Sequence, residues 1–356
     1  MKSYSRIFVV LALLPVGLSF LFAGDGQANA QDAIPEVIAT GLSTPSGVAI
    51  QPNTGHVFVA DSGAGRIVRV IKGNVEAVIT DFPGEGYGNG PTYNIGPLGL
   101  LFLDENTLIV GGGGLPDGED MIRVFTVPGV GQEPIKASDT LGDAFSLKAS
   151  GDKGDDDAKP GEGNFYGLAR GSRGVFVTCN GDDQQGWVAL ATLTQGNRIT
   201  KFERSIATKV ATNVKAPVAA TISPQGYLTI GQMGVTRNVK DSLLTFYSEV
   251  GTKLGVYRTG LNDITGLAYG PRHKRLFALD FNWANPKLGG LYKLVDMKND
   301  TKCEAVLMSR LEKPTALAFT TDGDCYITLA GSAKPADGKP DGKLIIIRQL
   351  DIDTTK

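Results

Sequence analysis

The sequence predicts an all-β fold, a six-bladed β-propeller with four-stranded blades, and three observations lead to this prediction. First, a pattern of turn, small residue and apolar strand recurs six times, at intervals of about 50 residues. Second, further short strands follow each recurrence before the next one begins. Third, the chain has 47 glycines and 18 prolines without a collagen period, which is typical of an all-β protein with many turns.

Each recurrence begins with a short stretch that contains the first strand of a blade. The fourth residue of this stretch is small. The six starts read TPSGVAI (44–50), GPLGLLF (96–102), NFYGLAR (164–170), APVAATI (216–222), DITGLAY (263–269) and KPTALAF (313–319). Their small residues are Gly47, Gly99, Gly167, Ala219, Gly266 and Ala316. First strands converge on the propeller axis, where a glycine lets two backbones approach closely. A β-sandwich is the alternative, but it would not be expected to repeat one local pattern six times.

The remaining strands of each blade follow the start in order. Second strands are expected at HVFVAD, TLIVGG, GVFVTCN, YLTIGQ, RLFALD and DCYITLA, and third strands at RIVRVI, MIRVFTV, WVALATL, SLLTFYS, GLYKLV and KLIIIRQL. Fourth strands are expected at VEAVIT (75–80), TKVATNV (208–214), KLGVYRTGL (253–261) and KCEAVLMSRL (302–311). The second repeat shows no clear fourth strand.

The two ends of the chain are predicted to share the last blade. The last repeat stops after its third strand, and the segment AIPEVIATGL (33–42) resembles the fourth strands of the other repeats. We expect this segment to complete the sixth blade and to close the ring, which removes an exposed sheet edge. Residues 31–356 then form a single domain.

The first thirty residues are typical of a cleavable signal peptide. Lys2 and Arg6 precede an apolar run at 7–22, and Ala28-Asn29-Ala30 supplies a cleavage pattern of small residues. We expect cleavage after Ala30 and a periplasmic or secreted protein with no membrane span after cleavage. An uncleaved membrane anchor is the alternative, but the apolar run is short for a span.

Charge and cysteine content exclude some classes of function. A formal charge of −2 and a pI of about 5.8 give no indication of a nucleic-acid partner. Cys179, Cys303 and Cys325 cannot all pair within one chain. We interpret them as small buried apolar residues, and one disulfide with a free thiol is the alternative. Asp61 and Arg66 are expected to pair across a hairpin.

The segment LSTPSGVAIQPNTGHVFVADSGAGRIVRV (42–70) resembles an NHL repeat, with its P-x-G-[VI]-A start, its V-A-D-S-G turn and its R-I centre. The resemblance implies a propeller of the NHL, gluconolactonase and strictosidine-synthase type. That class includes binding modules, calcium-dependent lactonases and lyases, so the fold alone does not select a function.

Gluconolactonase-like propellers hold a divalent cation at the top of the channel, with ligands just before the small residues of the first strands. The equivalent positions here are Ser46, Leu98, Tyr166, Val218, Thr265 and Thr315, and none is a carboxylate or an amide. A shift of one or two residues would bring Asn94, Asn164 and Asp263 near the channel mouth. Related zinc-dependent lyases use several histidines, whereas His56 and His273 are expected to be turn residues on the opposite face.

The loops that open on one face of the propeller are unusually long, and function usually gathers on such loops. We expect a small molecule or a protein partner to bind there. The candidate ligand-binding residues are Tyr87, Tyr93, Asn94, Phe165, Tyr166, Asn180, Gln232, Arg237, Asp280, Asn282 and Trp283. The alternative is that these are ordinary loop residues packed locally.

One loop also carries clustered carboxylates. Asp152, Asp155, Asp156 and Asp157 lie in GDKGDDDAKPGEG, which we interpret as a flexible acidic loop, with a calcium site as the alternative. No cofactor is expected to be required, and calcium remains an open alternative.

The sequence therefore predicts an extracytoplasmic, NHL-like binding or scaffold module rather than an enzyme. The first alternative is a divalent-cation-dependent hydrolase of lactonase or esterase type, or a lyase, with a site at the top of the channel. A second alternative is a propeller that positions a substrate in a secreted biosynthetic pathway without its own catalytic groups.

Overall fold

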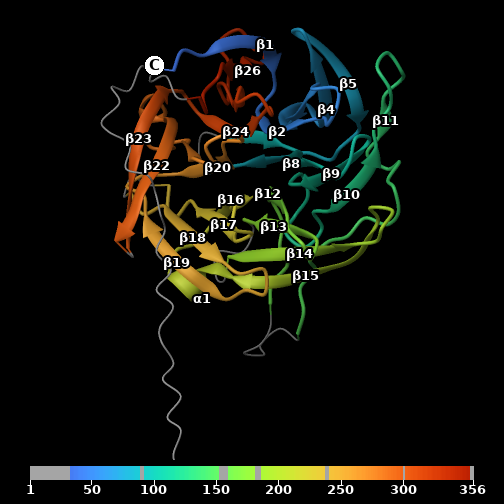
Figure 1. Ribbon diagram of the computed structural model, residues 1–356. Helices are drawn as coiled ribbons and strands as arrows, with labels where there is room; N and C mark the ends of the chain where they lie inside the picture. The colour runs from blue at the N-terminus through green and yellow to red at the C-terminus, as the bar shows by residue number, and fades with distance from the viewer. Residues whose placement is uncertain are drawn as a thin grey trace, which may run out of the picture.

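Six blades of mainly antiparallel strands surround one axis, and their first strands line it in the order β2, β8, β12, β16, β20 and β24 (Figure 1). Each of these strands contacts the next one, and β24 contacts β2, so that the ring is closed. Blades 4 and 5 are joined into one sheet by the parallel pair of β19 and β23. The computed structural model describes residues 33–88, 92–151, 159–180, 186–236, 240–299 and 301–352. The predicted signal peptide lies outside these residues. The all-β propeller prediction is confirmed.

In every blade the strands are named from the axis outward. Blade 1 consists of β2 (Pro45–Ile50), β3 (Val57–Asp61), β4 (Arg66–Ile71), β5 (Asn74–Thr80) and the short parallel β11 (Ile135–Lys136). Blade 2 consists of β8 (Pro97–Phe102), β9 (Thr107–Gly112) and β10 (Ile122–Thr126). Blade 3 consists of β12 (Phe165–Arg170), β13 (Val175–Cys179), β14 (Trp187–Leu193) and β15 (Ile199–Ala207).

Blade 4 consists of β16 (Pro217–Ile222), β17 (Leu228–Gln232), β18 (Leu243–Tyr247) and β19 (Lys253–Arg258). Blade 5 consists of β20 (Ile264–Tyr269), β21 (Leu276–Asp280), β22 (Gly290–Asn299) and β23 (Lys302–Arg310). Blade 6 consists of β24 (Pro314–Phe319), β25 (Cys325–Leu329), β26 (Gly342–Ile347) and β1 (Glu36–Leu42). The other elements are the hairpin β6 (Glu85–Tyr87) and β7 (Tyr93–Ile95), the helix α1 (Thr208–Thr212) and the 3₁₀ turns η1 (Ser62–Ala64) and η2 (Pro286–Leu288).

One of the predicted fourth strands is wrong, and the second repeat, in which the sequence shows no clear fourth strand, has none among the described residues. TKVATNV is not the fourth strand of blade 3: the nine-residue β15 before it pairs with β14, and Thr208–Thr212 form α1. The helix ends at Asn213, whose left-handed φ of 61° turns the chain back toward the axis. In blade 2 an irregular segment takes the place of the fourth strand. The Leu141 N–H of this segment donates to the Val124 carbonyl of β10 at 2.7 Å, and Phe145 forms an isolated β-bridge with Ile122.

The recurring small residue has the role that the sequence predicts for it. A Cβ atom built on Gly47, Gly99 or Gly167 would overlap the backbone carbonyl oxygen of the next blade's first strand. These carbonyls belong to Leu98, Tyr166 and Val218, the residues that directly precede the next blade's own small residue. The repeated glycine therefore sets the spacing of neighbouring blades at the axis.

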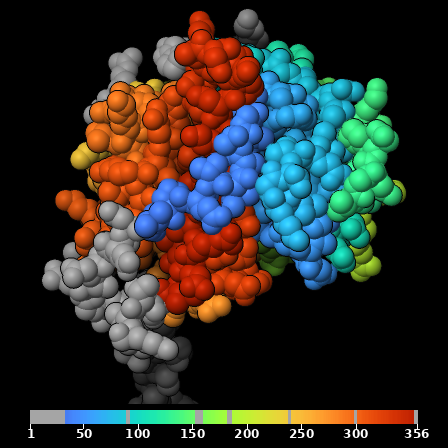
Figure 2. Space-filling view, turned by 90° about the horizontal axis from the view of Figure 1, so that it is seen from above, coloured from blue at the N-terminus to red at the C-terminus, as the bar shows by residue number. Residues whose placement is uncertain are grey.

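The ring is closed by the N-terminal strand, as predicted. β1 pairs antiparallel with β26 from Glu36 opposite Ile346 to Leu42 opposite Gly342. The space-filling view shows this blue segment lying against the red C-terminal blade and beside blade 1 (Figure 2). Ahead of the strand, the Ala33 N–H donates to the Met308 carbonyl at 3.0 Å and so ties the segment to blade 5 as well.

The hydrophobic core lies between adjacent blades. One cluster, for example, joins Phe58 and Ile67 of blade 1 to Leu108 and Phe125 of blade 2. Cys179, Cys303 and Cys325 are free and buried, which confirms their interpretation as core residues. The predicted Asp61–Arg66 pair is formed at 2.7 Å. Among the described residues, no helix has the length and apolar character needed to cross a membrane.

Candidate functional site

The β6–β7 hairpin lies over the mouth of the central channel. It belongs to the link from blade 1 to blade 2, yet the Tyr93 ring contacts Trp283 at 5.6 Å and Phe281 at 6.4 Å, both from blade 5 across the axis. The Lys313 ammonium, at the start of blade 6, lies 5.9 Å from the centre of the same ring. Tyr93 is only 3% exposed. The hairpin therefore covers the channel on the loop-rich face.

Tyr166 spans the channel beneath this hairpin. It is part of β12 in blade 3, and its hydroxyl donates to the Thr315 carbonyl of blade 6, on the opposite side of the ring, at 3.1 Å. Its ring packs with Val218, Met233 and Trp283. Burial raises the pKa of the Tyr166 hydroxyl, which stays protonated and can keep donating this bond.

Tyr87 brings a second hydroxyl to the same place. The Asn180 side-chain amide, just after β13, donates to the Tyr87 hydroxyl at 3.2 Å. Tyr87 also lies near enough to Tyr166 to raise the pKa of that residue further, after the larger effect of burial. We call the residues that converge here the aromatic mouth: Tyr87, Tyr93, Tyr166, Asn180 and Trp283.

The aromatic mouth consists of five of the predicted ligand-binding residues, drawn from links or strands that are far apart in the sequence. Its rings offer apolar faces, and the Asn180 amide and two tyrosine hydroxyls offer hydrogen-bonding groups beside them. Such a mixture suits a small molecule with both apolar and polar surfaces. Trp283 and Tyr87 are both partly exposed, so a ligand can reach them.

The structure places two predicted candidates in the interior instead. Phe165 is fully buried in blade 3 and packs edge to face on Phe202 at 5.2 Å. Gln232 is also fully buried, and its amide nitrogen donates to the Thr212 hydroxyl at 3.0 Å and to the Val214 carbonyl. Both belong to regular strands, and they lie so close to the strand ends that the sequence pattern does not separate them from the adjoining loops.

Asp280 and Asn282 support the site rather than line it. The Asp280 carboxylate is 2% exposed and accepts the N–H groups of Asp263 at 2.9 Å and of Asn282 at 3.2 Å. Asn282, itself 2% exposed, accepts the Asn285 N–H at 3.1 Å. Together these bonds shape the turn that presents Trp283. Asn94 is exposed on β7, while Arg237 lies outside the described residues.

The residues directly before the small residues of the first strands do not reproduce the cation ligands of gluconolactonase-like propellers. The Thr265 and Thr315 hydroxyls donate to the Pro314 carbonyl at 2.8 Å and the Pro45 carbonyl at 2.7 Å, so they link neighbouring blades. Leu98 and Val218 have no side-chain ligand atom. Within the described ranges, no three His, Cys, Asp or Glu side chains are placed to hold a metal ion. Asp152, Asp155, Asp156 and Asp157 lie outside those ranges.

Two buried carboxyl groups on this face have pKa values close to neutrality. Burial, with smaller contributions from the nearby Asp280 and Asp241, raises the pKa of Asp263 to about 7. The Trp283 backbone N–H, which donates to Oδ2 at 2.7 Å, acts in the opposite direction. Burial likewise raises the pKa of Asp120 to about 6, although Asn164 and Leu115 donate backbone N–H groups to it. From the sequence, Asp263 is a candidate site residue only if the alignment of the first strands is shifted by one or two residues. No sequence pattern indicates Asp120.

Replacement of Asp263 by asparagine is expected to stabilise the protein at alkaline pH. Because the pKa of Asp263 is raised from 3.8 to about 7, its ionised form is disfavoured in the folded state, and stability falls as pH rises from the lower to the higher value. Asp263→Asn should therefore raise the free energy of unfolding at pH 8 by roughly 2–4 kcal/mol and flatten its dependence on pH. Denaturant unfolding at pH 4, 6 and 8 measures this, with the exposed Asp322→Asn as control. Equal gains at all three pH values would contradict it.

No family profile and no curated protein sequence matches the chain. Solved structures do match it. The PQQ-bound aldose sugar dehydrogenase from Streptomyces coelicolor has a TM-score of 0.58 and 14% identity, over 88% of this chain and 98% of that one. A protein from Thermus thermophilus, described as a candidate oxidoreductase (glucose dehydrogenase), has a TM-score of 0.57 and 16% identity, over 88% and 99%. A protein described as a candidate gluconolactonase has a TM-score of 0.53 and 12% identity, over 88% and 91%.

At these identities the matches establish the fold, a β-propeller of the kind found in sugar dehydrogenases and gluconolactonase-like proteins. The gluconolactonase-like part of the sequence resemblance agrees with them, whereas they do not distinguish an NHL or strictosidine-synthase type. The solved structures with this fold include proteins described as enzymes.

Proposed function

We propose that the aromatic mouth binds a small molecule of the sugar or sugar-lactone class and that the protein is an enzyme acting on it. The observation that carries the proposal is the convergence of Tyr87, Tyr166, Asn180 and Trp283, from four separate segments, at one end of the channel. Sugars have flat apolar C–H faces and a rim of hydroxyl groups, which match aromatic rings beside amide and hydroxyl groups. The names of the proteins with similar folds support the same class.

The residues of the mouth would bind and orient the substrate in distinct ways. The Trp283 backbone N–H donates to the Asp263 carboxylate at 2.7 Å, and the Trp283 ring packs against Tyr93 at 5.6 Å and Phe281 at 4.5 Å, so the ring would be a fixed stacking surface. The Tyr87 hydroxyl and the Asn180 amide already bond each other and can re-pair with substrate hydroxyls. The β6–β7 hairpin, which carries Tyr87 and Tyr93, would shield one side of the bound molecule from water.

The described residues of the mouth do not fit a PQQ cofactor. PQQ carries several carboxylates, which call for a cluster of cationic side chains. The five residues of the aromatic mouth include no cation, and Lys313, whose ammonium lies 5.9 Å from the centre of the Tyr93 ring, is a single cation beside them. These residues therefore support no redox step through that group.

Cation-assisted hydrolysis is the second candidate function, favoured by the fold shared with the candidate gluconolactonase. Hydrolysis of glucono-1,5-lactone that is lost with a chelator and restored by calcium would support it.

Replacement of Trp283 tests the proposed binding site. Because Trp187 and Trp283 are the two tryptophans of the chain, a Trp187→Phe background makes Trp283 the single fluorophore. Titration with glucose, glucono-1,5-lactone and related aldonolactones should change its emission in a saturable way. Trp283→Ala is expected to weaken the binding seen by calorimetry about 30-fold, the loss of roughly 2 kcal/mol typical of a buried aromatic anchor.

A matched variant separates loss of binding from loss of folding. Tyr227→Ala, on the turn before β17 away from the channel mouth, should leave the affinity unchanged. Binding without turnover of any lactone or sugar tested would remove the enzymatic part of the proposal. Equal affinity in the wild-type protein and in Trp283→Ala would remove the site itself.

A further inference from the structure

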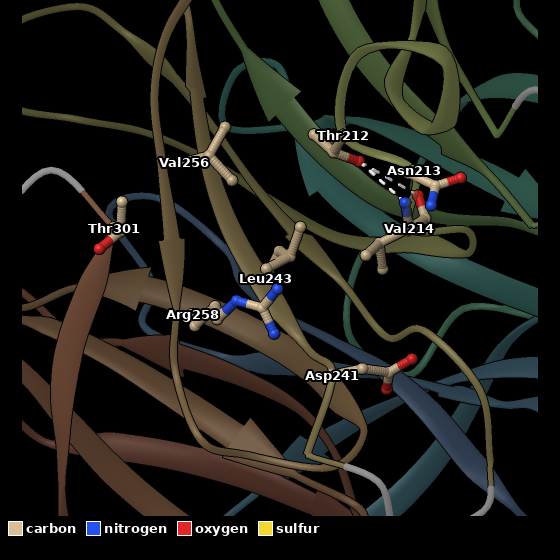
Figure 3. A pocket seen from close by; sticks show the side chains of 8 residues that line it. All are labelled: Thr212, Asn213, Val214, Asp241, Leu243, Val256, Arg258 and Thr301. Carbon is tan, nitrogen blue, oxygen red and sulfur yellow. Dashed lines mark hydrogen bonds between the residues drawn. The ribbon is translucent and has the colours of Figure 1, made fainter.

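A second pocket lies between blades 4 and 5, away from the aromatic mouth. It has a volume of about 450 Å³ and is open to solvent on one side. It is lined by the end of α1 and the link that follows it, by β18 with the residue two before it, by β19, and by the turn between β22 and β23 (Figure 3). The two blades meet here because Arg258 at the end of β19 pairs in parallel with Lys302 of β23. The Arg258 N–H also donates to the Thr301 carbonyl at 2.8 Å. The pocket is thus part of the seam between two blades.

Arg258 gives this pocket a positive charge. Within the described ranges, its guanidinium forms neither an ion pair nor a hydrogen bond, and Figure 3 shows it directed into the space among the lining residues. The nearest acidic residue of the lining is turned elsewhere. The Asp241 carboxylate accepts the Val235 N–H at 3.2 Å, and in Figure 3 it points away from the guanidinium.

The rest of the lining divides into polar and apolar parts. Leu243, Val256 and Val214 supply aliphatic surface, and Leu243 is 5% exposed. Asn213 and Thr301 supply an amide and a hydroxyl at the rim. Asn213 is fixed in the left-handed conformation at the end of α1, so its side chain is held beside the opening. The Thr212 hydroxyl is already engaged, because it donates to the Thr208 carbonyl at 2.9 Å.

We propose that this pocket binds a carboxylate attached to a short aliphatic chain. A guanidinium matches a carboxylate through two parallel hydrogen bonds, and a single guanidinium matches a single negative charge. The aliphatic walls would take the hydrocarbon part and exclude water from it. The volume allows a chain of several carbons. The site is separate from the aromatic mouth and does not depend on the function proposed for it.

A homologous series of ligands tests this inference. Calorimetric titration of the full mature protein with acetate, butyrate and hexanoate should give affinities that rise about threefold to fourfold for each added CH₂ group. Hexylammonium, which has the same chain and the opposite charge, should not bind. Arg258→Gln should weaken hexanoate binding at least tenfold, while Arg198→Gln, an exposed arginine of blade 3, should leave it unchanged.

The variant Val256→Ser separates the two parts of the site. It keeps Arg258 and should reduce the gain in affinity per carbon. Inorganic phosphate binding more tightly than hexanoate would overturn the assignment to an aliphatic carboxylate. No binding of hexanoate, or binding unchanged in Arg258→Gln, would overturn the site. Emission from Trp283 in the Trp187→Phe background should not respond to hexanoate, which distinguishes this pocket from the mouth.

Discussion

A chain that begins at Ser43 is expected to melt more than about 10 °C below a chain that begins at Ala33, or to fail to accumulate as folded protein. The deletion removes β1, whose Leu42 and Ala39 are 1% and 6% exposed and pack in the cluster around Val59 and Leu344. It also uncovers the edge of β26. That strand reads Leu344-Ile345-Ile346-Ile347 and is buried throughout this stretch, so an uncovered edge would invite aggregation.

The fall in melting temperature should exceed that caused by deletion of an ordinary N-terminal tail, because β1 and the residue before it contact three blades. It pairs with β26 of blade 6, packs against blade 1 through its buried side chains, and is preceded by the Ala33 bond to blade 5. Differential scanning calorimetry of the chains that begin at Ala33 and at Ser43 measures the effect. Addition of the peptide AIPEVIATGL should partly restore the shorter chain. Equal melting temperatures would show that ring closure contributes nothing to stability.

Most of the fold could be predicted because the propeller repeats its requirements. The same close approach of backbones at the axis recurs in the first three blades, so Gly47, Gly99 and Gly167 mark equivalent positions in the sequence. The fourth strands were harder because they lie on the outside, where one face meets water and the apolar pattern weakens. TKVATNV has an alternation that could pair as a strand, yet Val210 within it is 73% exposed on α1.

The candidate site was predictable in composition but not in geometry. Loop aromatics such as Tyr93 and Trp283 could be expected on the loop-rich face, but their contact across the axis depends on where the β6–β7 hairpin folds. The raised pKa of Asp263 could not be predicted, because it arises from burial and from Asp280 and Asp241, which are distant in sequence. The same is true of the pocket around Arg258, which exists only where two blades meet.

Replacement of Gly99 by alanine is expected to lower the free energy of unfolding by roughly 3 kcal/mol or more. The added Cβ would overlap the Tyr166 carbonyl oxygen and would lie 3.0 Å from the Leu168 side chain. A flexible side chain could move aside at little cost. A backbone carbonyl in a central strand cannot, since β12 is fixed by its pairing with β13 and by its contact with β16.

The effect should reach the aromatic mouth, because the displaced carbonyl belongs to Tyr166. Moving that residue would disturb the 3.1 Å bond from its hydroxyl to the Thr315 carbonyl across the channel. Denaturant unfolding measures the stability, and the emission of Trp283 in the Trp187→Phe background reports on the mouth. Ala316→Gly is the matched control, since alanine is native at that equivalent position, and the change should cost about 1 kcal/mol or less. A Gly99→Ala protein as stable as this control would show that the blades can move apart at the axis, and the glycine would then not be what sets their spacing.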